Sequence, residues 1–460
     1  MHRTGVLANY LKQLNQPYQT VKQEQIRERD PSIDAPFSPY QKFLIVILAV
    51  LQFTVILDFM VLSPLGDVLM KTLSIPPAHF GLVVSSYAFS AGLSGILAAG
   101  FADKFDRKKL LLFFYTGFIL GTLCCAMANS YELLLGARIV TGFFGGVIGS
   151  ICMAIITDEF AANHRGRVMG FVQMAFAASQ ILGLPAGLYI SNIWNWHATF
   201  WMIGILTAVI CVVILVKMRP IDKHLAFQSD KSPFLHLWHT LSNNNYGVAF
   251  IATAFMSIGG FMLMPFGSAY LINNIKITAA QLPMVYMWVG ISSVIIMPVV
   301  GKLSDRIDKF FLFSAGSVLA IVMIIIYTNL SAIPLWEVIA INMILFMGIM
   351  SRMIPATTLM TSVPEMRDRG AFMSINSSLQ QVAGGIAAMC AGFIVSQPSK
   401  NAPLQHYDTL GYVVSAVTIV CAVLIYRVNE LVKKKNEERA LNKINEQLAQ
   451  RNGALAEELA

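Results

Sequence analysis

Long apolar runs recur along most of this sequence and constrain its fold more than any other feature. A helix that crosses a bilayer needs about 20 consecutive, mostly apolar residues. Twelve segments approach this length, at 42–66, 80–102, 109–128, 132–157, 167–190, 197–217, 246–272, 279–301, 310–328, 334–360, 370–395 and 409–427. With 56% hydrophobic and 13% charged residues, the 460-residue chain is too apolar for a soluble globular protein. The sequence therefore predicts an all-α polytopic membrane protein with 12 transmembrane helices.

A short charged string occurs twice, each time between two apolar runs. The first copy, GFADKFDRKK, covers 100–109, and the second, GKLSDRIDK, covers 301–309. Another pair, HRGRVMG at 164–170 and DRGAFMS at 368–374, lies at nearly the same offset of about 200 residues. Two repeats in one register indicate two six-helix bundles related by an internal repeat, an organisation common in secondary transporters.

Polar stretches divide the chain into five parts. They are a polar, cytoplasmic N-terminal arm over 1–41, a first six-helix bundle over 42–217, a cytoplasmic linker over 218–245, a second six-helix bundle over 246–427 and a charged tail over 428–460. Because about 40 polar residues precede the first apolar run, we expect no cleavable signal peptide. Leucine and isoleucine at helical spacing predict that the tail is a cytoplasmic amphipathic helix, solvated or lying on a surface.

Lysine and arginine concentrate in alternate loops. One set of loops, which includes 100–109 and 301–309, carries most of them, whereas the intervening set carries little beyond Lys71, Lys276 and Lys400. This is the positive-inside signature, and it places the first set and both termini in the cytoplasm. The net charge of +8 follows from this pattern and does not indicate nucleic-acid binding. We expect a multi-pass protein embedded in the lipid bilayer of the cytoplasmic (inner) membrane.

Asp58 lies in the outer half of the first span, within the string FTVILDFMVL. A carboxylate at this depth costs roughly 3 kcal/mol on insertion scales and is a functional-site candidate by default. Arg138 in the fourth span lies at a similar depth, so the two charges can offset each other's desolvation. Protonation of Asp58 would free Arg138, which makes the pair a candidate for proton coupling. The alternative is a permanent ion pair that only locks two helices together.

Arg352 lies deep in the tenth span, and no acidic residue of the second half is an obvious partner. It either attracts an anion or another substrate into a central cavity, or it snorkels or binds carbonyl groups freed by Pro355. Met264–Phe266 in the seventh span resembles a locally unwound segment. Further candidates for the substrate cavity, each also suited to bonding between helices, are Gln173, Gln180, Tyr270, Asn376 and Gln380.

The two repeated loops are candidates for gating, because charges near helix ends can hold the cytoplasmic ends of two bundles together. Some of these charges also determine topology. The gating candidates are Gly100, Asp103, Arg107 and Lys108 in the first loop and Gly301, Asp305 and Arg306 in the second. In the fifth span, small residues and a proline favour close helix packing. This helix-packing pattern comprises Gly170, Gly183, Pro185 and Gly187.

Signatures of enzyme chemistry are absent from the sequence. It contains no Gly-x4-Gly-Lys-Ser/Thr string, no zinc-ligand spacing and no Gly-x-Ser-x-Gly nucleophile elbow. All 6 cysteines lie within apolar runs, where buried small hydrophobes are expected. We therefore expect a protein that is not an enzyme, that has no cofactor or metal, that is monomeric, and whose transport uses an existing gradient.

Together these residues resemble the major facilitator superfamily, in particular its 12-helix drug/proton antiporters and sugar-efflux-like permeases, over roughly residues 40–428. The first loop is similar to the family's motif Gly-x-Leu-Ala-Asp-Arg-x-Gly-Arg-Lys-x. Lys104 stands at its first arginine and Asp106 at its second glycine. The positions that match are Gly100, Asp103, Arg107 and Lys108.

The resemblance also implies roles. Arg138 with Gly142 is similar to the helix 4 motif of proton-coupled members, in which the arginine is implicated in proton transfer. Asp58 is similar in place to the helix 1 carboxylate of multidrug antiporters. The fifth span keeps the glycine spacing of the antiporter motif, which marks exporters, with Ser179 replacing one glycine and the proline one position late.

We therefore expect a secondary active transporter that works by alternating access, as a proton-coupled exporter (antiporter) of small organic molecules or drugs. In the expected cycle Asp58 is protonated from outside, its contact with Arg138 breaks, the halves rock, and the proton leaves inside. Two alternatives remain: an importer or uniporter of a sugar or organic anion with the same fold, and a transport-inactive membrane receptor.

Overall fold

The computed structural model describes residues 37–99, 101–222, 225, 233–304, 306–365 and 368–458. Within these residues the protein is helical, with no strand and one isolated β-bridge between Ser396 and Gln405. Twelve helical segments of this described part are long and apolar enough to cross a membrane, six on each side of the linker. The predicted fold class is therefore confirmed.

Several spans are built from more than one helical piece. The spans of the first half are α2 (Pro39–Val61), α4 (Pro77–Ala99), α5 (Arg107–Ala126), α6 (Tyr131–Glu159), the composite of α7 (Ala162–Ala178), η3 (Ser179–Gly183) and α8 (Leu184–Ile193), and α9 (Trp196–Lys217). Those of the second half are the composite of α11 (Asn244–Phe261), η5 (Met264–Phe266) and α12 (Gly267–Asn273), then α13 (Leu282–Ser304), α14 (Lys309–Thr328), α15 (Leu335–Ser362), α16 (Arg369–Ile394) and α17 (Tyr407–Glu458). Shorter elements are α3 (Gly66–Leu73), η2 (Ala102–Lys104) and α10 (Pro233–Leu241).

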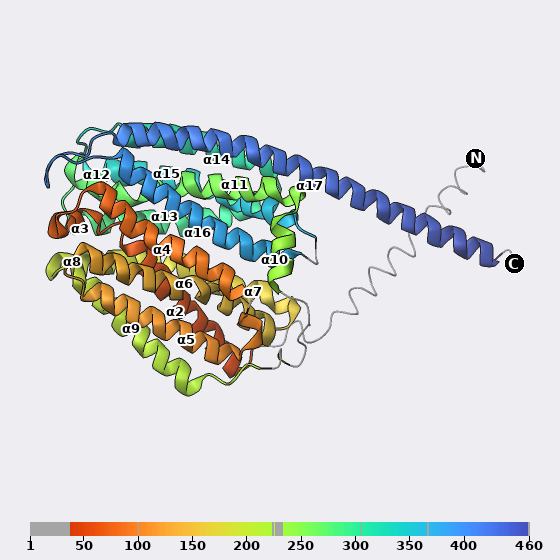
Figure 1. Ribbon diagram of the computed structural model, residues 1–460. Coiled ribbons are helices and arrows are strands. Elements are labelled where there is room, and N and C mark those ends of the chain that lie inside the picture. The colour runs from red at the N-terminus through yellow and green to blue at the C-terminus, as the bar shows by residue number, and fades with distance from the viewer. Residues whose placement is uncertain are drawn as a thin grey trace, which may run out of the picture.

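The two halves form two groups of helices that lie side by side, with α4 and α16 at their boundary (Figure 1). α3 and α12 lie at one end of the molecule, called the α3 end below, and α10 lies at the other, called the α10 end. Glycines allow α4 and α16 to touch. A Cβ on Gly81 would lie 2.8 Å from the carbonyl oxygen of Ala388, and one on Gly92 would lie 2.9 Å from that of Ser378.

Buried apolar side chains form three clusters. The first contains residues of both halves near the α3 end, such as Leu65 and Leu69 with Phe266 and Leu271. The second cluster belongs to the first half alone and the third to the second half alone, and both lie towards the α10 end. The halves therefore share one core near the α3 end, whereas towards the α10 end each half packs around its own core.

The repeated loop begins an equivalent helix in each half. Asp106 and Asp308 are the N-cap residues of α5 and α14, with φ of −53° and −54° and ψ of 127° in both. Their carboxylates accept hydrogen bonds from the backbone N–H groups of Lys109 at 2.9 Å and Phe311 at 3.0 Å. A carboxylate at this position satisfies a free N–H group and interacts favourably with the helix dipole.

Three spans depart from a single regular helix. The first span ends at Val61, and the expected residues 62–66 form a turn that leads into the separate helix α3. The seventh is interrupted at the 3-10 turn Met264–Phe266, so the unwound segment suggested by the sequence is present. The fifth contains the π-helical segment η3, in which the N–H of Leu184 donates to the carbonyl of Ser179 five residues earlier. The adjacent Pro185 has no N–H to continue the regular pattern.

The last span and the tail form one helix. α17 continues from Tyr407 to Glu458, whereas the sequence predicts a boundary after residue 427, and Figure 1 shows its C-terminal part projecting beyond the bundle. No proline lies between 428 and 458 to stop the helix. The predicted arm over 1–41 falls mostly outside the described residues, which begin at 37, and α2 begins at Pro39 rather than 42. The predicted linker contains α10, and α11 begins at Asn244.

Candidate functional site

A buried ion pair lies inside the first half. Arg138 Nη1 on α6 lies 2.7 Å from Asp58 Oδ2 on α2, and both side chains are fully buried. Thr122 of α5 donates a hydrogen bond to Asp58 Oδ1 at 3.2 Å. The guanidinium carbon of Arg138 lies 4.5 Å from the ring centroid of Tyr87 on α4. Four helices of the first half therefore meet at this pair.

Glycines bring these helices close enough for the contact. A Cβ on Gly121 of α5 would lie 2.8 Å from the backbone nitrogen of Thr141 on α6. One on Gly183 of η3 would lie 2.7 Å from Leu57 Cδ1, next to Asp58 on α2. Larger side chains would push the helices apart. The charged residues thus attract each other, and the small residues allow the backbones of their helices to come close enough for the contact.

The ion pair is balanced in charge but not fully hydrogen-bonded. Nε and Nη2 of Arg138 are buried and have no hydrogen-bond partner within the described part of the chain. Burying two charges costs several kcal/mol per ion, roughly, and close geometry must offset that cost. Neutralising Asp58 would leave Arg138 as an uncompensated buried charge.

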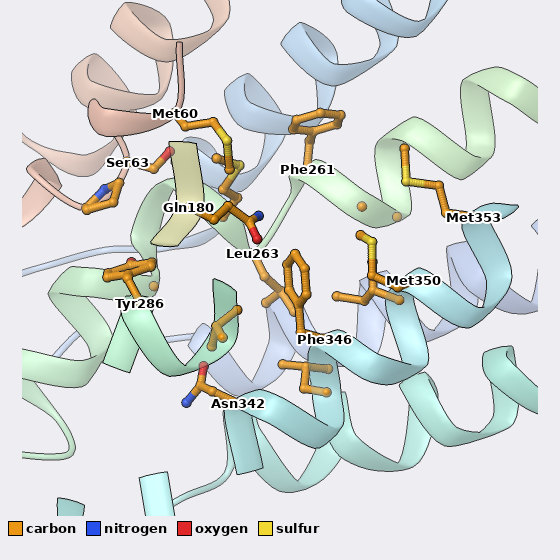
Figure 2. Close-up of a pocket in the computed structure, with 18 of the residues that line it drawn as sticks. Met60, Ser63, Gln180, Phe261, Leu263, Tyr286, Asn342, Phe346, Met350 and Met353 are labelled. Atoms are coloured by element: carbon orange, nitrogen blue, oxygen red, sulfur yellow. The ribbon is translucent and has the colours of Figure 1, made fainter. Parts of the chain in front are cut away.

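A central cavity of about 280 Å³ lies between the two halves. Residues of α2, η3 and α8 line it from the first half, and residues of α11, α13 and α15 line it from the second. Figure 2 shows Met60 and Gln180 near Phe261 and Leu263, with Phe346 and Met350 on α15. Most of the lining side chains are aromatic or aliphatic, so the cavity is suited to an apolar ligand body.

Arg352 is the only charged residue among those that line this cavity, all of which belong to the described part of the chain. It is 4% exposed, and its Nη1 donates to Thr418 Oγ1 on α17 at 3.2 Å. The guanidinium also lies 5.6 Å from the ring centroid of Phe313. Its Nε and Nη2 have no hydrogen-bond partner among the residues that the structure describes, so it does not bind the carbonyl groups near Pro355 through them.

Gln180 and Gln380, which the sequence assigns to the cavity, do line it. Gln180 lies in η3, and its Oε1 accepts a hydrogen bond from Ser293 Oγ on α13 at 3.1 Å. This bond joins the two halves at the cavity wall. The π-helical segment places Gln180 there, because its wider turn rotates the residues of the fifth span relative to a regular helix.

Three other residues that the sequence assigns to the cavity lie outside the lining of this one. Gln173 is exposed and outside the lining of the cavity, because it lies two helical turns from η3 on α7. Asn376 accepts a 2.6 Å hydrogen bond from Thr253 Oγ1 and so joins α16 to α11. Tyr270 lies behind the wall, where its ring stacks on that of Tyr407 with centroids 4.1 Å apart. Only Tyr407 of these two aromatic residues lines the cavity.

Sequence reasoning missed the aromatic wall of the cavity. Phe59, Phe261, Tyr286, Phe346 and Tyr407 all line it. In a membrane protein, such residues face lipid, helix interfaces and cavities alike, so their type alone does not reveal their position. The one available signal was the place of Phe59, directly after Asp58 on α2.

Tyr87 lies between the ion pair and the cavity wall. Its ring faces Arg138 and lies 5.2 Å, centroid to centroid, from the ring of Phe59. Phe59 lines the cavity and lies 5.9 Å from the ring of Phe261 on α11. Asp58 itself is not among the lining residues. A layer of aromatic rings therefore separates the ion pair from the cavity.

A polar cluster joins the two halves at the α3 end. Asn273 Nδ2 on α12 donates to Asp67 Oδ1 on α3 at 2.5 Å, and both residues are 4% exposed. Lys71 Nζ lies 2.8 Å from Asp67 Oδ2 and 3.2 Å from Asn273 Oδ1. Nearby, Ser268 donates to the carbonyl of Ser63 at 3.0 Å. The sequence gives no sign of this cluster, because Asn273 lies about 200 residues from Asp67 and Lys71 in the chain.

Arg107 and Lys108, the gating candidates of the first loop whose side chains are described, bind partners within the first half. Arg107 Nε lies 2.9 Å from Asp158 Oδ2 at the end of α6. Lys108 Nζ donates to the carbonyls of Leu215 at 2.9 Å and Met218 at 2.7 Å, at the end of α9. Arg107 also lines a second cavity, of about 400 Å³, between α4 and α6 on one side and α16 on the other. Its role as a gate stays a prediction.

Of the remaining gating candidates, the structure fully describes only Gly301 and Arg306. Gly100 and Asp305 lie outside the described residues, as does the side chain of Asp103. Arg306 is exposed, and a Cβ on Gly301 would meet nothing within 4 Å.

The helix-packing glycines of the fifth span differ from one another. A Cβ on Gly187 would lie 3.1 Å from Val61 Cγ2 on α2, so Gly187, like Gly183, faces the helix that carries Asp58. A Cβ on Gly170 would meet nothing within 4 Å. Pro185 follows η3 and opens α8. Two of the three glycines therefore hold the fifth span against α2.

Within the described ranges, no group of three or more His, Cys, Asp or Glu residues is arranged to hold a metal ion. All six cysteines are free thiols.

Comparisons with known proteins match this chain to membrane transporters. The family model described as "Major Facilitator Superfamily" matches residues 48–388 and 249–455. The MFS-type transporter YbcL of Bacillus subtilis (strain 168) is 24% identical over 383 residues, which cover 83% of this chain and 95% of the relative. A probable sugar efflux transporter of Mannheimia succiniciproducens is 22% identical over 378 residues, covering 80% and 90%.

Solved structures show the same fold at low sequence identity. A bacterial homologue of the human lysosomal transporter Spinster, in an inward-facing and unoccupied conformation, has a TM-score of 0.69 and 15% identity, covering 87% of this chain and 99% of that one. The nucleoside transporter NupG has a TM-score of 0.69 and 14% identity, covering 84% and 99%.

Proposed function

This chain belongs to the Major Facilitator Superfamily of membrane transporters, and from that premise we propose that it is a proton-coupled exporter of small organic molecules. The observation that carries the proposal is the fully buried pair of Asp58 and Arg138, one aromatic layer from the central cavity. An ionisable residue inside a membrane is a default candidate for proton transfer. Relatives described as probable sugar efflux transporters support the direction of export.

The proposed orientation has the α10 end in the cytoplasm. The loops at that end contain the charged strings at 100–109 and 301–309, whereas the α3 end carries few basic residues. This distribution agrees with the positive-inside rule. Both termini would then be cytoplasmic, in a monomer that lies in the inner membrane of a bacterium.

The proposed conformation is inward-facing. The halves share a core at the α3 end and are joined there by Asp67, Asn273 and Lys71, whereas towards the α10 end they have separate cores. In alternating access, the two halves rock about a central site, so that one end is closed while the other opens. Closure at the α3 end supports a state that binds its cargo from the cytoplasm.

The proposed cycle uses the ion pair as its switch. In the inward state, the ionised Asp58 binds Arg138 and the cavity accepts cargo. After the halves rock, cargo leaves outside and Asp58 takes up a proton, which frees Arg138. The return to the inward state carries the proton to the cytoplasmic side, where binding of cargo releases it and restores the pair. Movement of one charge through the membrane potential supplies about 2.3 kcal/mol per 100 mV.

The experiment that tests this proposal is substrate-induced proton movement in proteoliposomes. Cationic dyes, sugars and organic anions are screened with the wild type, with Asp58→Asn, and with Asp408→Asn, an exposed carboxylate of α17, as the matched control. We expect proton release on addition of cargo by the wild type and the control, and none by Asp58→Asn. Cargo flux without proton movement, or an unchanged pH dependence in Asp58→Asn, contradicts the proposal and favours a uniporter.

A further inference from the structure

The free edge of Arg352 is shaped to bind a carboxylate. A guanidinium is planar and presents its N–H groups in a rigid fork that matches the two oxygens of a carboxylate. In Arg352, Nη1 donates to the hydroxyl of Thr418 and the thiol of Cys421 also interacts with the guanidinium, whereas Nε and Nη2 have no hydrogen-bond partner among the described residues. Nε and Nη2 lie on the same edge of the guanidinium plane. The two unpartnered donors are therefore one complete bidentate edge.

This edge lies at the wall of the cavity, and both of its nitrogen atoms are buried. Arg352 lines the cavity while being 4% exposed, and a Cβ on Gly259, which lines the facing side of α11, would lie 4.0 Å from Nη2. The hydroxyl of Ser257, also on α11 and also lining the cavity, is buried without a partner. A ligand oxygen would satisfy donors on both helices once the side chains that cover these buried atoms move aside. Buried donors without acceptors are otherwise uncommon in folded proteins.

The charge of Arg352 is uncompensated. No Asp or Glu is among the residues that line the cavity, and no described carboxylate forms an ion pair with Arg352. Arg138, by contrast, has its counter-ion Asp58 at 2.7 Å. α11, which corresponds to α2 in the internal repeat, carries no charged residue at all. An arginine cannot lose its proton in a protein, so it needs an anion from elsewhere.

The other side chains of the cavity wall determine which kind of ligand body fits. Met60, Phe261, Leu263, Phe346 and Met350 face the same space (Figure 2). A sugar would leave most of its hydroxyl groups without partners against such a wall, which costs binding energy for each of them. A cation would meet Arg352 with no carboxylate to hold it. One anionic group on an apolar body suits both parts of the cavity, whose volume of about 280 Å³ matches a small ligand.

We infer that the cargo of the central cavity is an amphipathic organic monoanion, whose carboxylate binds the Nε and Nη2 edge of Arg352 and whose apolar body packs among the methionine and phenylalanine side chains. This inference rests on the proposed function, in which this cavity is the transport site. It narrows the cargo from small organic molecules to lipophilic weak acids in their ionised form.

The test compares head groups on a constant body. Purified full-length protein in detergent is titrated calorimetrically with decanoate, 4-phenylbutyrate and 2-naphthylacetate, and with the neutral primary amide and the ammonium analogue of each. We expect at least one carboxylate to bind at least roughly tenfold more tightly than its own amide, and the ammonium analogues to bind least. If no carboxylate binds more tightly than its amide, including no binding by any of them, the inference is overturned.

Variants then assign the preference to Arg352. Arg352→Gln is expected to reduce the affinity for the carboxylate to that for the amide and to leave the affinity for the amide unchanged. Arg352→Lys retains the charge and is expected to keep part of the preference for the carboxylate over the amide. Binding by this variant would show that substitution at this position does not by itself disrupt folding. The matched control is Arg219→Gln, an exposed arginine over the ring of Tyr40, which should bind as the wild type does. An equal loss of carboxylate and amide binding in Arg352→Gln, with Arg352→Lys also impaired for both, would overturn the assignment.

The binding test needs no proton gradient, so it separates this inference from the proposed function. Preference for the carboxylate without proton release in proteoliposomes would leave the cargo class standing and contradict proton coupling. Proton release with cations or sugars, without preference for a carboxylate, would leave the proposed function standing and contradict the cargo class.

Discussion

Asn273 of the second half donates a 2.5 Å hydrogen bond to the carboxylate of Asp67 in the first half, and Lys71 completes the cluster from the same helix as Asp67. Both partners of the hydrogen bond are almost fully buried, so water does not compete for it. The bond joins α3 to α12 at the end of the molecule where the halves share a core. It is therefore placed to hold this end closed.

Asn273→Ala is expected to open the α3 end. A hydrogen bond to a charged group contributes about 1.5–3 kcal/mol, so its loss shifts a two-state equilibrium roughly tenfold or more towards the open form. The measurement is the rate at which a membrane-impermeant maleimide, added from outside, labels Ser63→Cys in the cavity wall of a protein without other cysteines. Asn329→Ala removes hydrogen bonds to Ile325 on α14 and from Tyr412 on α17, all within the second half, and serves as the control. Equal labelling rates in the two variants would refute the role of the cluster.

The ion pair should respond unequally to loss of its two members. Asp58→Leu leaves a guanidinium that cannot be neutralised and should lower the free energy of unfolding by about 3–5 kcal/mol. Arg138→Met should cost less, because the remaining carboxyl group can take up a proton.

The double variant Asp58→Leu/Arg138→Met should recover much of the lost stability and still lack substrate-induced proton release. Thermal unfolding in detergent and the proteoliposome assay measure the two properties separately. A double variant that keeps proton release would show that the pair only locks α2 to α6.

Gly290 on α13 touches the backbone of η3 across the two halves. A Cβ there would lie 2.9 Å from the nitrogen of Ile181 and 3.0 Å from the carbonyl carbon of Gln180, which cannot move without disrupting η3. Gly290→Ala should therefore destabilise this conformation by about 1–3 kcal/mol and speed the labelling of Ser63→Cys from outside. Gly301→Ala on the same helix meets nothing within 4 Å and should be neutral or stabilising. The prediction is wrong if both alanines behave alike.

Tyr87 should couple the cavity to the ion pair through its ring rather than through its hydroxyl. Tyr87→Phe keeps an aromatic face over Arg138 and a partner for Phe59, whereas Tyr87→Leu removes both contacts. A cation–π contact is worth about 0.5–2 kcal/mol. We expect Tyr87→Leu to lower the number of protons released per cargo molecule bound and Tyr87→Phe to preserve it. Loss of coupling in both variants would assign the role to the hydroxyl group instead.

Much of the architecture was predictable because the bilayer restricts the choices. Only helices satisfy the backbone within single spans, so length and apolar composition determine the number of crossings. The charged strings at 100–109 and 301–309 revealed the two halves, and their aspartates begin equivalent helices. Asp58 and Arg138 were expected to pair, since charges at similar depth in one bundle have few other partners, and the structure brings them to 2.7 Å.

The sequence by itself therefore determined the fold class, the spans, the internal repeat and the two charges of the ion pair. The tertiary structure alone decided that Arg352 lines the central cavity, that Gln180 lines it while Gln173 does not, and that Asp67 meets Asn273. The physical reason is that apolar and small residues suit lipid, helix interfaces and cavities equally well. The rotation of each helix, and hence what its side chains face, is set by packing between residues far apart in the chain, such as Gly290 against η3.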